Sequence, residues 1–391
     1  MKKLILLALC CLVAAGLFVV GCGDDGATDA TQTTAAPTET TAAPETETTA
    51  APETESTEGS TEAEVIKLTF ASEKPPTHLD SVHMFPGFFE AVEEYTNGKY
   101  KFEIEWFPVN TILAPADVWD GLANGIVTSG ESSMGYNPRA FPVIQTMMQP
   151  GISPPKDTRA MNYAGTKLLE KYQPEELSAN HLFFLYACGP GWLHADYPIE
   201  TVDQLKGMRI RCSGTAVRAI ELVGGDPIAM PMADVYEAAQ KGTIDALVSP
   251  AETLEGWKHN ELFDYSTFMN QIYASDFMWV AMNNDTWNSL PDDLKAAFDA
   301  VSPEYSLVAG AMWDYGHNHA LEVSEPLGHQ TAELPEAEKA KLTELVKPVR
   351  DEYKAMLDGL GLPGEQIIND CVAFMEEANA REYETWEPPA E

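Results

Sequence analysis

The pattern of apolar and polar positions divides the chain into three parts. Residues 4–20 are almost wholly apolar and follow Lys2 and Lys3, which is typical of a signal peptide (residues 1–21) and not of a membrane-spanning helix. Residues 22–65 repeat units rich in Ala, Pro, Glu and Thr without an aromatic side chain. Such a segment cannot bury enough surface to fold, so it predicts a disordered linker. A folded region is expected from residue 66 onward.

Within the folded region, segments with the period of a strand alternate with segments with the period of a helix. β-rich apolar runs predict strands at residues 66–70, 102–107, 181–187, 208–211, 244–247 and 277–283, with a further short segment at 134–136. Helical spacing predicts helices at residues 81–95, 118–125, 216–223 and 233–241, and from Leu290 to residue 381 the pattern is mainly helical. This order predicts an α/β fold with βαβ units, divided into two lobes with chain crossovers.

The net charge of the chain limits which classes of molecule it can bind. The 391-residue chain carries 61 acidic and 24 basic side chains, a formal net charge of −37. Such a surface repels nucleic acid and anionic membrane, which excludes both as direct binding partners. An anionic ligand would need a local positive site, so the few arginines are the most informative candidates.

The motif at Cys22 predicts an extracytoplasmic location for the protein. The sequence Val-Val-Gly-Cys ending at Cys22 resembles the lipobox of bacterial lipoproteins, which implies lipidation at Cys22 and an extracytoplasmic, membrane-anchored protein; plain secretion is the alternative. Cys188, Cys212 and Cys371 have no metal-binding spacing. A Cys188–Cys212 disulfide and three buried thiols are both compatible with that location.

A series of short motifs resembles the solute-binding proteins of TRAP transporters, the DctP-like family. In chain order they are FAS and PPTH (70–78), GYNPRAFP (135–142), LKGMRIR (205–211), GDPIAMPMADVYEA (225–238), GTIDA (242–246) and MNNDTWNSLP (282–291). The resemblance implies a two-lobed, periplasmic-binding-protein-like (Venus flytrap) fold with crossover strands and long C-terminal helices. Residues 66–189 and 277–324 would form lobe I, and residues 190–276 and 325–391 lobe II.

The resemblance also implies a function and a principal binding residue. It implies capture of a small organic acid and its delivery to TRAP membrane subunits, with no enzymatic activity, cofactor or metal. In the resembled family, the arginine at the position of Arg211 pairs with the ligand carboxylate. A guanidinium group suits this role because its planar fork matches a carboxylate and keeps its charge when buried. The alternative is a strand arginine paired with a surface acid.

The chain departs from the family at a second position. Sialate- and dicarboxylate-binding members carry another arginine where residues 189–199 have none. Trp192 and His194 occupy that segment, and Ser249 stands where the family often has asparagine. These differences argue against sialic acid or a plain C4-dicarboxylate, and they favour a larger or aromatic monocarboxylate.

The remaining candidates each have a structural alternative. Tyr136 and Arg139 are expected in a loop facing the cleft, where Arg139 would contact the anion or form a salt bridge between the lobes. His78 is expected to be either a ligand contact or a capping residue. Met232, Trp257 and Trp279 are expected to line the pocket or to pack in the core.

Other classes of protein were weighed against this interpretation. No nucleophile elbow, zinc-protease motif, P-loop or dinucleotide fingerprint occurs in the chain, which argues against an enzyme. A binding protein of an ABC importer and a receptor-coupled binding lipoprotein remain the alternatives, because both have the lobed architecture and differ in the membrane partner.

Overall fold

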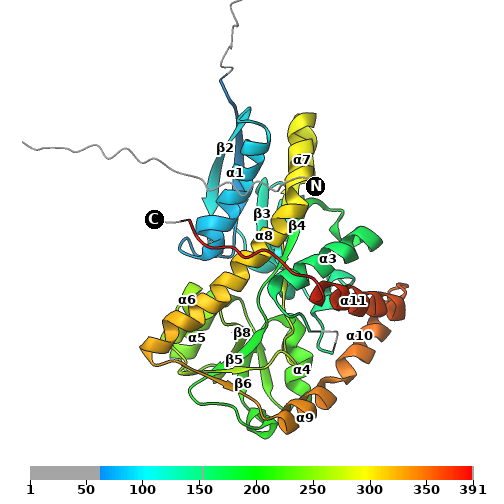
Figure 1. Cartoon of the computed structure of the whole chain (residues 1–391). Helices are drawn as coiled ribbons and strands as arrows, with labels where there is room; N and C mark the ends of the chain where they lie inside the picture. Colours follow the sequence, from blue (N-terminus) through cyan, green and yellow to red (C-terminus); the bar gives the residue numbers. More distant parts are fainter. Residues whose placement is uncertain (1–61, 152–153, 390–391) are drawn as a thin grey trace, which may run out of the picture. The chain divides into compact units, whose positions relative to one another are not determined.

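Two mixed β-sheets organise the structure, a computed structural model that describes residues 62–151 and 154–389 (Figure 1). The first sheet has the order β2 (Tyr100–Phe107), β1 (Glu64–Ala71), β3 (Ser129–Ser133), β10 (Phe277–Asn283), β4 (Asn180–Ala187). The second has the order β11 (Gln330–Glu333), β9 (Tyr265–Phe268), β5 (Gly191–Ala195), β8 (Ala246–Pro250), β6 (Arg209–Cys212), β7 (Asp226–Ala229). The predicted two-lobed α/β fold is confirmed. The signal segment, Cys22 and the linker up to residue 61 lie outside the described residues.

The chain crosses between the sheets at neighbouring points. After β4 it passes directly into β5 of the second sheet, and after β9 it returns through residues 269–276 to β10, which lies antiparallel between β3 and β4. The crossing segments are hydrogen-bonded to each other: the N–H of Cys188 donates to the carbonyl of Asp276 (3.0 Å), and that of Gly191 to the carbonyl of Tyr273 (3.1 Å). Side chains at these crossovers therefore lie where the two sheets meet.

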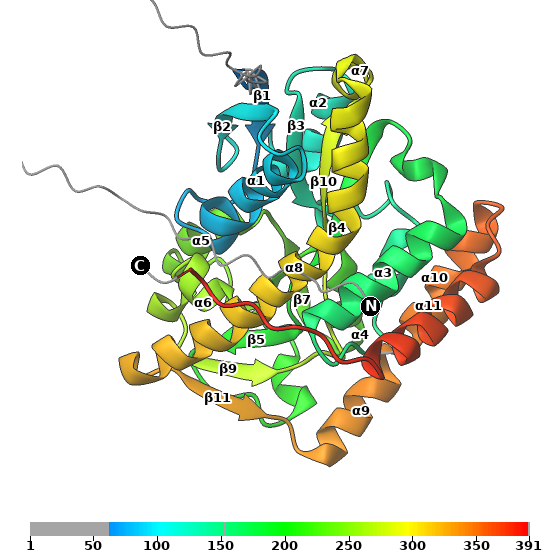
Figure 2. The same ribbon diagram turned by 45° about the horizontal axis from the view of Figure 1, so that its top comes forward.

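Helices cover both sheets (Figure 2). Their bounds are α1 Phe85–Tyr95, α2 Val118–Ala123, α3 Thr158–Tyr172, α4 Val217–Leu222, α5 Val235–Gln240, α6 Thr253–Gly256, α7 Asn284–Ser289, α8 Asp292–Ser324, α9 Glu336–Val346, α10 Pro348–Gly359 and α11 Gly364–Asn379. Helix α8 is 33 residues long and packs on α1, α3 and β4 beside the first sheet and on α6 beside the second. One continuous helix thus contacts both lobes.

Burial explains why the predicted strands form. All seven residues of β10, Phe-Met-Trp-Val-Ala-Met-Asn, are buried, as expected of a continuous apolar run in a covered strand. Beside it, the fully buried ring of Phe88 on α1 lies 5.0–5.8 Å from the rings of Phe184, Phe183, Tyr305 and Phe298. This aromatic cluster joins α1, β4 and α8.

Strand β3 shows where the apolar pattern was misleading. Its sequence Ser-Gly-Glu-Ser-Ser is polar, yet every residue is buried; residues 134–136 form a short 3₁₀ turn instead. The Glu131 carboxylate accepts hydrogen bonds from Ser72 Oγ (2.6 Å) and the N–H of Glu73 (2.9 Å). Partners from the neighbouring strand end therefore replace water around this acid, and no periodicity reports such a pairing.

The C-terminal segment does not stay with the second sheet. Strand β11 joins that sheet, but α11 packs on α3, and Ile367 and Cys371 share a buried cluster with Trp119 and Phe277. We therefore propose the expected division into lobes with one change, which places α11 with lobe I. An amphipathic helix pattern indicates that a face is covered but not which surface covers it.

Truncating the central aromatic ring tests this account of the core. We expect Phe88→Ala to lower the free energy of unfolding by about 3–5 kcal/mol, because it removes buried contacts and leaves a cavity. Denaturant unfolding of the chain from residue 62 measures the change. Tyr95→Ala on the same helix is the control, since Tyr95 is 58% exposed; equal losses in the two variants would contradict the assignment.

Candidate functional site

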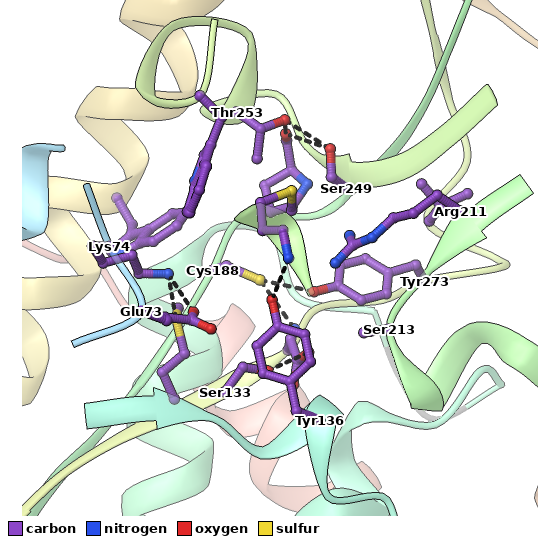
Figure 3. A pocket seen from close by; sticks show the side chains of 17 residues that line it. Glu73, Lys74, Ser133, Tyr136, Cys188, Arg211, Ser213, Ser249, Thr253 and Tyr273 are labelled. Carbon is purple, nitrogen blue, oxygen red and sulfur yellow. Dashed lines mark hydrogen bonds and ion pairs between the residues drawn. The ribbon is translucent and has the colours of Figure 1, made fainter. Parts of the chain in front are cut away.

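A cavity with about 450 Å³ of empty space, partly open to solvent, lies where side chains of both sheets and their crossovers converge (Figure 3). It is lined by Glu73, Lys74, Ser133, Tyr136, Cys188, Arg211, Ser213, Met232, Val248, Ser249, Pro250, Thr253, Trp257, Tyr273, Asp276, Met278 and Trp313. Apolar walls with a few polar groups are typical of small-molecule sites.

Arg211 supplies a buried positive charge. It lies in β6 between β8 and β7, and its residue is 2% exposed. Its Nε and Nη2 donate to the carbonyl of Met230 at 3.1 and 2.7 Å. Within the described ranges, no carboxylate lies within 4.0 Å of its guanidinium nitrogens as an ion-pair partner. A buried charge without a counter-charge is costly, so this side chain is suited to an anion that enters the cavity.

Lys74 provides a second cation that is already paired. Its Nζ donates to Glu73 Oε1 at 2.8 Å, and its residue is 4% exposed. Burial alone would lower the pKa of Lys74, but the charges of Glu73, Glu131 and Asp80 outweigh it and raise the pKa well above its ordinary value. The lysine is thus held charged within an acidic surrounding.

Asp276 brings a carboxyl group to the same cavity. Its Oδ2 accepts a hydrogen bond from Ser133 Oγ at 2.8 Å. Burial, with a further contribution from the Glu73 charge, raises the pKa of Asp276 to about 7.

Tyrosine and tryptophan rings complete the walls. The Tyr136 hydroxyl accepts a hydrogen bond from the N–H of Met232 at 3.1 Å, which joins the end of β3 to the second sheet. The Tyr273 hydroxyl lies 3.0 Å from Cys188 Sγ, and burial raises the pKa of Tyr136. With Trp257 and Trp313, these rings form flat surfaces suited to an apolar ligand body. Cys188, Cys212 and Cys371 are all free, buried thiols.

The structure brings half of the predicted site residues together. Arg211, Tyr136, Met232, Ser249 and Trp257 all line the cavity. The hydroxyl of Ser249 lies 2.7 Å from that of Thr253, which also lines the cavity.

Two predicted residues of β5 lie away from the cavity. His194 is fully buried, with Nδ1 2.6 Å from Ser266 Oγ, and the Trp192 ring packs 5.1 Å from that of Phe268. The two residues share one face of the strand because side chains alternate, and on that face they contact their cross-strand neighbours on β9, Phe268 and Ser266.

The other three predicted residues also stand outside the lining. Trp279 is 1% exposed and packs edge-on against Trp119 in the core, whereas Arg139 is exposed at the surface beyond a turn. His78 is fully buried behind the wall, with Nε2 3.1 Å from Glu252 Oε1. Burial alone would lower the pKa of His78, but the charges of Glu252 and Asp80 raise it.

Sequence reasoning missed three charged lining residues. Glu73 and Lys74 follow β1 directly, and Asp276 precedes β10. The carboxyl end of a parallel strand is where α/β proteins place ligands, so the position of Glu73 and Lys74 was an available signal. Asp276 reaches the cavity because of the crossover between the sheets, and no signal in the sequence indicated this position.

Comparison with known proteins identifies the family. Residues 70–356 match the model of the family "Bacterial extracellular solute-binding protein, family 7" (DctP). The chain belongs to this family. It is therefore an extracytoplasmic solute-binding protein of the TRAP type, from a family of binding proteins and not of enzymes. No helix among residues 62–151 and 154–389 combines the length and apolar character needed to cross a membrane.

The curated relatives share a low sequence identity with the chain over most of its length. The C4-dicarboxylate-binding periplasmic protein DctP of Rhodobacter capsulatus is 25% identical over 68% of this chain and 80% of its own length. The 2,3-diketo-L-gulonate-binding periplasmic protein YiaO of Escherichia coli is 26% identical over 75% of this chain and 84% of its own.

Solved structures share the fold. A TRAP solute-binding protein of Rhodoferax ferrireducens, in complex with copurified benzoate, has a TM-score of 0.75 at 22% identity and covers 80% of this chain and 98% of its own. One from Bordetella bronchiseptica, with bound (R)- and (S)-mandelate, has a TM-score of 0.73 at 23% identity and covers 80% and 99%.

The burial of His194 predicts a dependence of stability on pH. Burial, reinforced by His329, lowers the pKa of His194 to about 3. Between that value and the ordinary pKa of about 6.5, the unfolded chain binds a proton that the folded protein does not, so the free energy of unfolding rises with pH. We expect His194→Gln to reduce this slope by up to about 1.4 kcal/mol per pH unit between pH 4 and 6.

Denaturant unfolding at several pH values measures that slope. The control is His319→Gln, because the side chain of His319 is 35% exposed and its ring keeps contact with water. A slope unchanged by His194→Gln would refute the assignment.

Proposed function

We propose that this protein captures a small organic acid outside the cell, in particular a larger or aromatic monocarboxylate, and delivers it to the membrane subunits of a TRAP transporter. The observation that carries the proposal is the buried guanidinium of Arg211, which faces the cavity without an ion-pair partner among the described residues. A ligand carboxylate would supply the missing counter-charge in a two-pronged geometry.

The cavity walls support a ligand with a broad apolar body. Trp257, Trp313 and Tyr273 present rings, and Met232 and Met278 present flexible thioethers. The fold neighbours solved with benzoate and mandelate show that this architecture accommodates aromatic acids in other chains. The curated relatives named for C4-dicarboxylate and diketogulonate show that the family's ligands vary.

Lobe closure is the proposed mechanism of capture. The Tyr136–Met232 hydrogen bond joins a first-lobe loop to the second lobe at the cavity, and the His78–Glu252 contact joins the two lobes behind the cavity wall. Both contacts would form as the lobes close over a ligand bound to Arg211. The closed form would then be recognised by the membrane subunits.

Anchoring to the membrane is a separate part of the proposal. The Cys22 motif supports lipid attachment, and residues 22–65 would then act as a spacer. The family match favours a TRAP transporter over the ABC-importer and receptor-coupled alternatives.

Native mass spectrometry of the gently purified chain from residue 62 tests the proposal directly. A copurified organic acid is expected and would identify the ligand. If the protein is empty, a thermal-shift screen of aliphatic and aromatic carboxylates replaces it, because a ligand that binds the folded state raises its stability. No stabilisation by any acid would reject the proposal.

Arg211→Ala tests the principal contact. We expect a loss of binding free energy of about 2–5 kcal/mol, because the ligand anion would lose its buried partner. Calorimetric titration with the identified acid measures the change. Arg209→Ala is a matched control in the same strand, since Arg209 is half-exposed and paired with Asp245; it should bind normally. Unchanged affinity in Arg211→Ala would defeat the assignment.

A further inference from the structure

Two carboxyl groups line a cavity whose proposed ligand is itself an acid. Glu73 and Asp276 are each 4% exposed, and both contribute to the lining. Carboxylates in such a place repel a ligand carboxylate and lose their hydration, so they require a partner that the ligand body can provide.

Each carboxyl group has one oxygen with a partner and one without. Glu73 Oε1 accepts from Lys74 Nζ at 2.8 Å, and Asp276 Oδ2 accepts from Ser133 Oγ at 2.8 Å. Within the part of the chain that the structure describes, Glu73 Oε2 and Asp276 Oδ1 are buried and accept no hydrogen bond. Buried acceptors are nearly always satisfied in folded proteins, by protein groups or by ordered water, so these two oxygens leave room for donors from a ligand or from water.

The ionisable groups that line the cavity leave one cation and one carboxyl group without an ion-pair partner, and a cation bound beside Asp276 would favour its ionised form. Lys74 and Glu73 form an ion pair. Arg211 and Asp276 have no ion-pair partner among residues 62–151 and 154–389. A simple monoanion would compensate Arg211 alone. A molecule with a carboxylate and a cationic nitrogen would compensate both.

The position of the Asp276 carboxyl group depends on a neighbouring glycine. A Cβ atom at Gly135 would lie 2.2 Å from Asp276 Oδ2, so any side chain there would push the carboxyl group away. Ser133, two residues earlier, holds the same oxygen. The turn after β3 thus fixes the position of Asp276 Oδ2, whereas Oδ1 has no hydrogen-bond partner among the described residues.

The aromatic walls suit a cation as well as an apolar body. The Lys74 Nζ already lies 5.5 Å from the centre of the Trp313 ring, within the range at which a ring face attracts a positive charge. Tyr136, Trp257 and Tyr273 add further rings around the same space.

We propose that the ligand is a zwitterion: an organic acid whose carboxylate binds Arg211 and whose protonated nitrogen donates to Asp276 Oδ1 and Glu73 Oε2. This inference rests on the proposed function and narrows its ligand class. Glu73 and Asp276 act as residues that determine specificity for the nitrogen.

Calorimetric titration of the full chain with matched acids tests the inference. One series is 4-ethyl-, 4-(hydroxymethyl)- and 4-(aminomethyl)benzoate with the corresponding 3-isomers; the other pairs 4-aminobutanoate with pentanoate and 6-aminohexanoate with heptanoate. We expect at least one amino acid of the panel to bind about tenfold or more tightly than its uncharged counterpart, as expected for a charge-assisted pair in a buried site. Equal or weaker binding of every amino member, or equal binding of the hydroxymethyl acid, would overturn the inference.

Two isosteric variants locate the effect. Asp276→Asn and Glu73→Gln should each lower the affinity ratio of the amino acid to its counterpart by about tenfold. Glu304→Gln, at an exposed site on α8, removes the same charge and should leave the ratio unchanged. An affinity ratio that neither cavity variant changes would also overturn the inference. If the variants fail to fold, the affinity ratio measured in the unaltered protein remains the test.

The two proposals fail in different ways. If no acid binds, or if Arg211→Ala binds the acids as well as the unaltered protein does, the proposed function fails. If the acids bind through Arg211 but the uncharged members bind equally well, the proposed function stands and only the zwitterion is excluded.

Discussion

The uncompensated charge of Arg211 is the constraint on which the site depends. A guanidinium group that is 2% exposed, and that bonds only the carbonyl of Met230 within the described residues, costs free energy until an anion reaches it. The two sheets hold this buried charge in a position that a ligand carboxylate could reach. They place the group at the end of β6, among aromatic rings, where water is largely excluded and a carboxylate pairs strongly. The fold thereby keeps a buried cation that the proposed ligand carboxylate would pair with.

Buried acids on the opposite side of the cavity determine what else can enter. Lys74 is held by Glu73, and behind it the pKa of Glu131 is raised to about 7 by burial and by the Glu73 charge. This arrangement uses up one positive charge and leaves Asp276 without a cation. Such a group suits a binding protein that selects among acids by a second functional group.

Regular elements with a strong apolar pattern were predictable. The strand over 277–283 and the helix start at Leu290 and Pro291 follow directly from burial and propensity. Strand β3 was not, because its polar side chains are satisfied by the end of β1, far along the chain. The same reason explains the candidate site. Arg211 and Tyr136 lie within motifs. Trp192 and His194 instead contact their cross-strand neighbours on β9, and the sequence pattern does not show which strands pair.

The sequence by itself determined the α/β class and the family resemblance. These depend on local periodicity and on short motifs, both of which are readable along the chain. Only the tertiary structure decided that Glu73, Lys74 and Asp276 share one cavity with Arg211, and that α11 packs on α3. Those outcomes are contacts between segments far apart in sequence, and they arise from the crossovers that bring the two sheets together.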